Sequence, residues 1–70
     1  MPMKAYRMLT GFDDSAFCHK VTEALSKGWV LHGDPVYAFD PIAAQMRCGQ
    51  AVIKEVPDHD YDPVVKLGNL

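Results

Sequence analysis

The segment Lys27–Pro35 constrains this chain most, because a helical pattern stops there and a strand pattern begins. Before it, over residues 14–27, apolar side chains recur at the spacing of one helix face: Phe17, Val21, Ala24 and Leu25, with Cys18 at the edge of the stripe. Either aspartate at positions 13 and 14 can cap the first turn, and Gly28 is typical of the left-handed residue that ends a helix. We therefore predict a helix over 14–27, followed by a strand in which Trp29, the single tryptophan, enters the core.

Three segments have the composition of β-strands. The first, residues 5–10, is a short aromatic and apolar run closed by Gly11. The second, residues 29–39, is interrupted at 33–35, where glycine permits a bulge and proline cannot donate a ladder hydrogen bond. The third, residues 45–56, is the longest; Gly49 within it marks a weak point or a close contact, and Pro57 ends it.

This order of elements predicts an α+β fold of the type β-α-β-β. A right-handed crossover from the first strand leaves room for the third strand between the other two, which gives the sheet order 1-3-2 with the helix on one face. Residues 1–57 are expected to form this single domain and residues 58–70 an acidic flexible tail, in which 64–67 could instead add a strand or dock on a neighbour. The second face of the sheet is left uncovered, and an uncovered apolar face usually marks a partner.

Size and charge narrow the classes of function. Seventy residues hold one core, which in such small scaffolds rarely supplies more than about 3–5 kcal/mol. The two cysteines match no disulfide framework or zinc pattern, so a second subunit is the expected source of extra stability. The net charge is −2 and the basic residues are scattered singly, which weighs against nucleic acid as a partner. The sequence has no long apolar run of the kind that predicts a signal peptide or a membrane span, so a cytoplasmic location is expected.

Several stretches resemble one family of short bacterial and phage domains. They are Tyr6–Gly11, the stripe from Phe17 to Leu25, Gly28-Trp29-x-Leu31-x-Gly33-x-Pro35, and Gln50–Lys54. On these motifs the chain is identified as resembling DUF1737, a domain-of-unknown-function family, over about residues 4–55. Members typically have a second glycine at the position of Asp34 and an aromatic residue near Cys48. The resemblance supports a single domain with this fold and implies no site.

Two histidines have neighbours with which they could form a catalytic or ligand-binding pair. Cys18 and His19 are a potential nucleophile and base, but adjacent helical residues point about 100° apart, so Cys18 is interpreted as a small core residue. His32 and Asp34 lie at the break in the second strand, where a carboxylate could fix the histidine tautomer. No nucleophile lies near them in sequence, and two such residues share a strand face for ordinary structural reasons.

Two further groups have binding potential. Asp58, His59, Asp60 and Asp62 are metal-ligand residue types, but they lack the glycine turn and spaced bidentate acid of a calcium loop. Trp29, Tyr37 and Phe39 would share one face of a regular strand, where aromatic side chains can stack on bases or pack in a core or interface. Without basic neighbours, packing is the favoured interpretation. We predict no metal, no cofactor and no catalytic residue.

The favoured function is therefore a small non-enzymatic homo-oligomeric module, a dimer or higher, for interaction or scaffolding. The alternative is a small-ligand or nucleic-acid binder that uses an inter-subunit cleft near Trp29, His32 and Tyr37. Five residues are the candidates for binding or interface contacts: Trp29, His32, Asp34, Tyr37 and Phe39.

Overall fold

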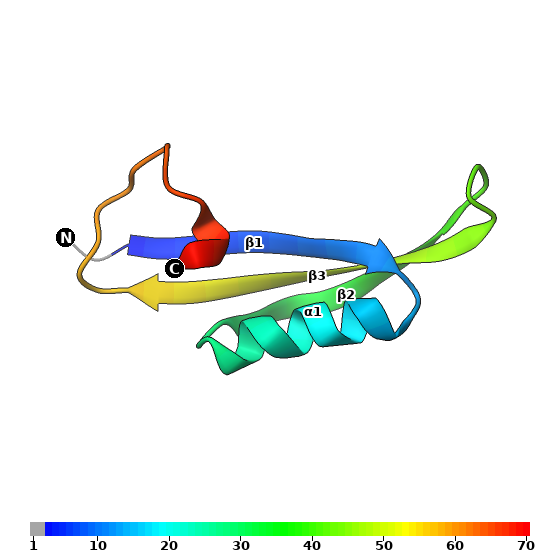
Figure 1. The fold of residues 1–70 in the computed structure, drawn as a ribbon, viewed down its shortest axis with the longest axis horizontal. Coiled ribbons are helices and arrows are strands. Elements are labelled where there is room, and N and C mark those ends of the chain that lie inside the picture. Colours follow the sequence, from blue (N-terminus) through cyan, green and yellow to red (C-terminus); the bar gives the residue numbers. More distant parts are fainter. Residues whose placement is uncertain (1–2) are drawn as a thin grey trace.

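The computed structural model describes residues 3–70 and confirms the predicted β-α-β-β fold (Figure 1). Strands β1 (Met3–Phe12), β2 (Val30–Asp40) and β3 (Gln45–Val56) form an antiparallel sheet in the order β1-β3-β2. Helix α1 (Ser15–Ser26) connects β1 to β2 and lies against one face of the sheet. Because β3 lies in the middle, it pairs with the whole length of β1 and with most of β2.

The ends of α1 follow the signals in the sequence. Asp14 is the N-cap, and its Oδ1 accepts a hydrogen bond from the backbone N–H of Phe17 at 3.2 Å. At the other end Gly28 takes a φ of +95°, a left-handed conformation that glycine adopts without strain. The chain then reverses, and the backbone N–H of Trp29 donates to the carbonyl of Ala24 at 3.1 Å.

The core lies between α1 and the strands β1 and β3. Its buried members come from β1, α1, β3 and the connection between α1 and β2: Ala5, Leu9, Ala24, Trp29, Val52 and Val56. Trp29 is only 2 % exposed, as predicted. The Arg7 guanidinium and the Lys54 ammonium lie 5.3 Å and 5.9 Å from the centre of its ring, and such cation–π contacts stabilise a buried aromatic residue. No described residue bonds the Trp29 indole N–H.

The helix stripe is narrower than the sequence indicates. Phe17 and Val21 pack on the core, but Cys18 and Leu25 are exposed, so the predictions that they pack in the core are wrong. The reason is the position of α1, which packs mainly on β1 and extends little over β2.

Strand β2 contains the predicted irregularity, and it is larger than a single-residue bulge. His32 pairs with Ala51 and Val36 pairs with Gly49, so three residues, 33–35, lie opposite Gln50 alone. The Gln50 side chain crosses this gap: its Nε2 donates to the backbone carbonyls of Gly33 at 3.2 Å and of His32 at 3.4 Å. Two extra residues preserve the alternation of strand faces, so odd-numbered residues remain on the helix side throughout β2.

The last residues lie against the domain. A 3₁₀ helix, η1 (Leu67–Asn69), contacts β1, and the carbonyl of Leu70 accepts a hydrogen bond from Lys54 Nζ. Residues 64–67 add no strand to the sheet. The division into a domain over 1–57 and a flexible tail over 58–70 stays a prediction.

Candidate functional site

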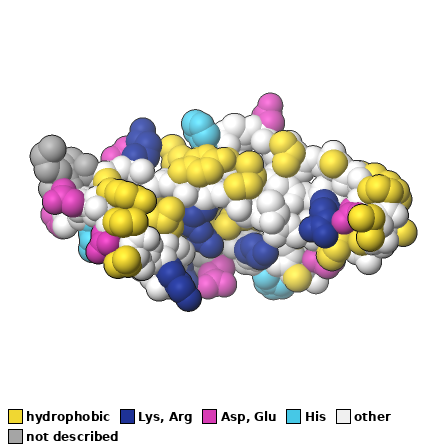
Figure 2. All heavy atoms as spheres, turned by 90° about the horizontal axis from the view of Figure 1, so that it is seen from above, with side chains coloured by type: hydrophobic (Ala, Val, Ile, Leu, Met, Phe, Trp, Pro, Cys, Tyr) yellow, Lys and Arg dark blue, Asp and Glu magenta, His cyan; other side chains and the backbone are white. Residues whose placement is uncertain are grey.

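The face of the sheet opposite α1 carries an apolar strip that runs across all three strands. Cross-strand pairing puts these residues on one face: Tyr6 and Met8 of β1, Ala51 and Ile53 of β3, and Val30 and Val36 of β2. Tyr6, Met8, Val30 and Val36 are each about half exposed. We call this surface the open face. Figure 2 shows hydrophobic side chains at the surface along the length of the molecule, and more at its right-hand end.

Gly49 makes the strip continuous. A methyl group on this residue would lie 2.7 Å from Val36 Cγ2 and 3.5 Å from Met8 Sδ, so side chains from the two outer strands meet above the central one. The sequence allowed either a weak point or a close contact at Gly49. The structure identifies a close contact, because only a residue without a Cβ leaves room for both neighbours.

Charged residues occupy the two ends of the open face. At one end Lys4 Nζ lies 3.6 Å from Glu55 Oε1. At the other end Arg47 Nε bonds Asp40 Oδ2 at 2.6 Å, and the guanidinium lies 4.5 Å from the centre of the Phe12 ring. An apolar centre with a polar border is the usual anatomy of a protein interface. The two charges at each end compensate each other within one chain. Two stacked copies therefore bring no unpaired like charges together, whether their strands run in the same or in opposite directions.

The domain is elongated and therefore exposes more surface than a compact domain of the same mass. Its extents are 44 × 22 × 19 Å, and its radius of gyration is 13.8 Å, compared with about 11 Å for a compact domain of this length. The accessible surface is 5133 Å², whereas a compact monomer of the same mass exposes about 4,400 Å². The excess of roughly 700 Å² is close to the 800 Å² or so that each partner buries in a standard interface.

The structure separates the five residues proposed from the sequence. Trp29 is in the core and His32 lies on the open face beside Ala51. Asp34 lies in the bulge. Tyr37 and Phe39 are on the helix side of β2, more than half exposed. One chain therefore does not bring Trp29, His32 and Tyr37 into a common cleft, and a cleft between subunits near them stays a prediction.

Tyr37 of β2 and Cys48 of β3 are paired across the two strands. The carboxylate of Asp13 contributes to the raised pKa of both side chains. The Tyr37 hydroxyl donates to Asp13 Oδ2, and this hydrogen bond raises the pKa of the tyrosine. Partial burial, with the nearby Asp13 charge, also raises the pKa of the Cys48 thiol. The raised pKa keeps the Cys48 thiol protonated, and a protonated thiol is a poor nucleophile.

Within residues 3–70, no three His, Cys, Asp or Glu side chains gather in a way that could hold a metal ion. The helices in the same range are all too short or too polar to cross a bilayer.

The fold and its exposed strip define a small α+β domain with one helix-covered face and one apolar face in contact with solvent. A family model for DUF1737, described as a domain of unknown function, matches residues 3–55. The chain therefore belongs to the DUF1737 family, as the motifs indicated. No curated protein and no solved structure matches the chain significantly.

Sequence reasoning predicted an uncovered face but did not identify its residues. The alternation in residues 5–10 puts Tyr6 and Met8 on one face of the strand, but alternation alone does not show which face is buried. The packing of Ala5 and Leu9 in the core decides this. The pairing with β3 does not, because both faces of β3 are apolar near its middle. The role of Gln50 had no signal beyond its position in the family motif.

Proposed function

We propose that this domain is a homo-oligomeric interaction module in which the open face of one chain packs on the open face of a second chain. The observation that carries this proposal is the continuous apolar strip across three strands, bordered by charged pairs. Apolar side chains that are exposed to water gain free energy of burial when they contact another apolar surface. A partner that covers the open face would therefore be stabilised by this burial.

A second copy is the favoured occupant for two reasons. The excess accessible surface, roughly 700 Å² per chain, is of the size that one partner contributes to a standard interface. In addition, the charges at the border of the strip are paired within one chain, so they do not oppose a second copy. Most soluble oligomers are two-fold dimers in which both chains use the same surface. Two sheets stacked face to face form a core about 10 Å thick, as in β-sandwiches.

Light scattering on the purified chain tests this proposal. The wild type is expected to have about twice the chain mass of 7.8 kDa at micromolar concentration. Val30→Lys places a charge in the strip and is expected to shift the mass towards that of a single chain. Val64→Lys is the matched control, because Val64 is an exposed valine outside the sheet. A wild-type chain that stays monomeric, or a Val30→Lys variant that associates like the control, would contradict the proposal.

A further inference from the structure

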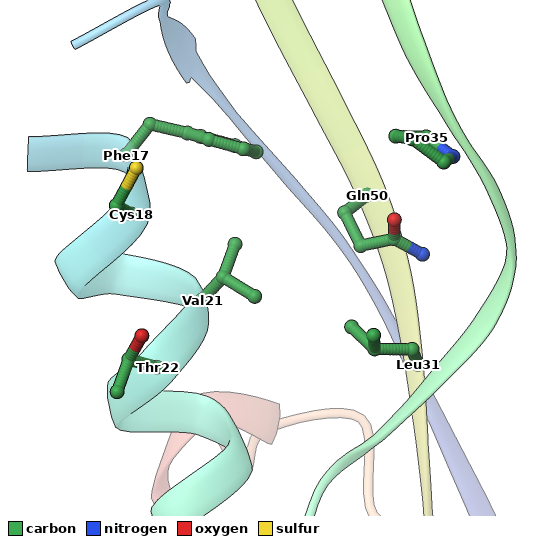
Figure 3. Close-up of a pocket in the computed structure, with 7 residues that line it drawn as sticks. All are labelled: Phe17, Cys18, Val21, Thr22, Leu31, Pro35 and Gln50. Carbon is green, nitrogen blue, oxygen red and sulfur yellow. The ribbon is translucent and has the colours of Figure 1, made fainter. Parts of the chain in front are cut away.

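Helix α1 has a hollow on each side, and the two differ in charge. The hollow towards β2 is lined by residues such as Phe17, Leu31 and Gln50, and none of its lining residues is charged (Figure 3). The hollow towards β1 has a volume of about 90 Å³, far below the roughly 300–1,000 Å³ of pockets for drug-sized ligands, so it suits one small group. We call it the cationic hollow, and its lining comes from β1, α1 and η1: Arg7, Lys20, Glu23, Ala24, Lys27 and Gly68.

The lining of the cationic hollow is positively charged, although the whole chain is acidic. Three cations and one anion, Glu23, give the lining a net charge of +2, whereas the whole sequence carries −2. The three cations stand at positions 7, 20 and 27, far apart in the sequence, and the packing of α1 on β1 brings them together. Because like charges held close together repel each other, the hollow favours an anion over a cation or a neutral group.

Arg7 has hydrogen-bond donors that the described part of the chain does not use. Its guanidinium lies over the Trp29 ring, 5.3 Å from the ring centre, and packs against Gly68, where a methyl group would lie 3.4 Å from Nη2. These two contacts restrain the guanidinium without using its N–H groups. No described residue accepts a hydrogen bond from Arg7 or forms an ion pair with it. A restrained guanidinium with free N–H groups is suited to bind the oxygens of a phosphate or a carboxylate.

The two lysines are held at the hollow by hydrogen bonds that use only part of their donor capacity. Lys20 Nζ donates to the carbonyl of Thr10 at 2.7 Å, and Lys27 Nζ donates to Glu23 Oε1 at 2.9 Å. Each ammonium group has three donors, so each retains two for a further acceptor. The hydrogen bond from Lys27, together with the charges of Lys27 and Arg7, lowers the pKa of Glu23. The Glu23 carboxylate is therefore ionised at neutral pH and offsets one of the three positive charges.

We propose that the cationic hollow binds a phosphate group, as the free ion or at the end of a small ester, between Arg7 of β1 and Lys20 and Lys27 of α1. A phosphate group carries a charge of about −1.5 to −2 at neutral pH, which matches the net charge of the lining. Its oxygens point in several directions and can accept from donors on both elements, whereas the two oxygens of a carboxylate lie in one plane. The hollow is on the helix side of the sheet, so the proposal does not depend on association through the open face.

Titration of the isotope-labelled full-length chain with inorganic phosphate at neutral pH tests this site. The Arg7 Nε–H signal and the Gly68 amide signal in the NMR spectrum are expected to shift along a saturating curve. Sodium chloride at the same ionic strength is the reference, because screening acts on every exposed charge. A parallel titration with glycerol phosphate distinguishes the two sources, since the probe that binds more tightly identifies the free ion or the ester. Shifts no larger than those with chloride would overturn the site, and acetate that binds as tightly as phosphate would overturn the choice of phosphate.

Charge-changing variants on the exposed helix surface locate the binding. Lys20→Gln removes a cation from the hollow and should weaken phosphate binding about threefold, as expected for one charge about 6 Å away in water. Glu23→Gln removes the anion and should tighten binding by a similar factor. Lys4→Gln is the matched control: it makes the same charge change as Lys20→Gln, but Lys4 pairs with Glu55 on the open face. Equal affinities of Lys20→Gln and Lys4→Gln, or no tightening in Glu23→Gln, would overturn the proposal.

Discussion

Trp29→Ala is expected to remove most of the stability of this domain. Trp29 is one of the two largest fully buried side chains, the other being Val52, and it lies directly before the strand that follows the helix. The cations of Arg7 and Lys54 flank its ring, so its loss leaves two charged groups without their aromatic neighbour as well as a cavity.

The size of the effect can be compared with the total stability. Truncation of a buried large aromatic residue to alanine costs about 3–5 kcal/mol. The single core of a domain of 70 residues rarely supplies more than about 3–5 kcal/mol in total. The variant should therefore retain only a small margin or be mostly unfolded at 25 °C. Trp29→Phe should lose much less, because it keeps an aromatic ring and removes an indole N–H that no described residue bonds.

Urea denaturation followed by far-ultraviolet circular dichroism measures these differences. All variants are compared at one chain concentration, because self-association would contribute to apparent stability. Phe39→Ala is the matched control: it also truncates an aromatic residue, but Phe39 is more than half exposed, and surface changes are usually within about 0.5 kcal/mol. A Trp29→Ala protein with the same unfolding midpoint as the control would refute the placement of Trp29 at the centre of the core.

Three other predictions concern polar contacts. Gln50→Leu removes the donor for the carbonyls in the β2 bulge. The free energy of unfolding measured by urea denaturation should fall by about 1 kcal/mol, and amide hydrogen exchange at residues 33–35 should become faster. Unchanged exchange would contradict this role of Gln50. The hydrogen bond from Arg47, followed by those from Ala43 and Ile42, lowers the pKa of Asp40 below its ordinary value. The stabilisation of the β2–β3 turn by the Asp40 carboxylate should therefore persist at neutral pH and disappear as the pH falls through that lowered value. The expected signal is a shift of the Ile42 amide resonance in that pH range, which Asp40→Asn should abolish. Asp13→Asn removes the charged acceptor that raises the pKa of Tyr37; an ultraviolet titration should then show tyrosinate forming at lower pH, and an unchanged titration would count against the hydrogen bond.

The sequence was sufficient for the elements and their order because the deciding signals are local. Asp14 and Gly28 mark the ends of α1 through their own backbone chemistry, and the strand order follows from the handedness of one crossover. The position of α1 across the sheet is not a local property. It depends on which strand residues pack against the helix, and for that reason Leu25 and Cys18 are exposed despite their correct helical spacing.

The candidate surfaces were predictable only in outline. An uncovered face follows from counting one helix against a three-stranded sheet, but its continuity depends on Gly49, where a Cβ would collide with Val36 of another strand. The hydrogen bonds of Gln50 depend on a two-residue insertion in β2, whose size the Gly33-Asp34-Pro35 signal does not specify. In each case the missing information is a contact between residues distant in sequence.

The central claim is that a second copy of this chain covers the open face. Isotope-filtered NOE measurements on a mixture of labelled and unlabelled wild-type chains test it most directly, because they detect only contacts between chains. The account predicts cross-chain contacts from the methyl groups of Met8, Val30, Val36 and Ile53. Cross-chain contacts confined to the helix side of the sheet, or none from these four residues at millimolar concentration, would contradict it.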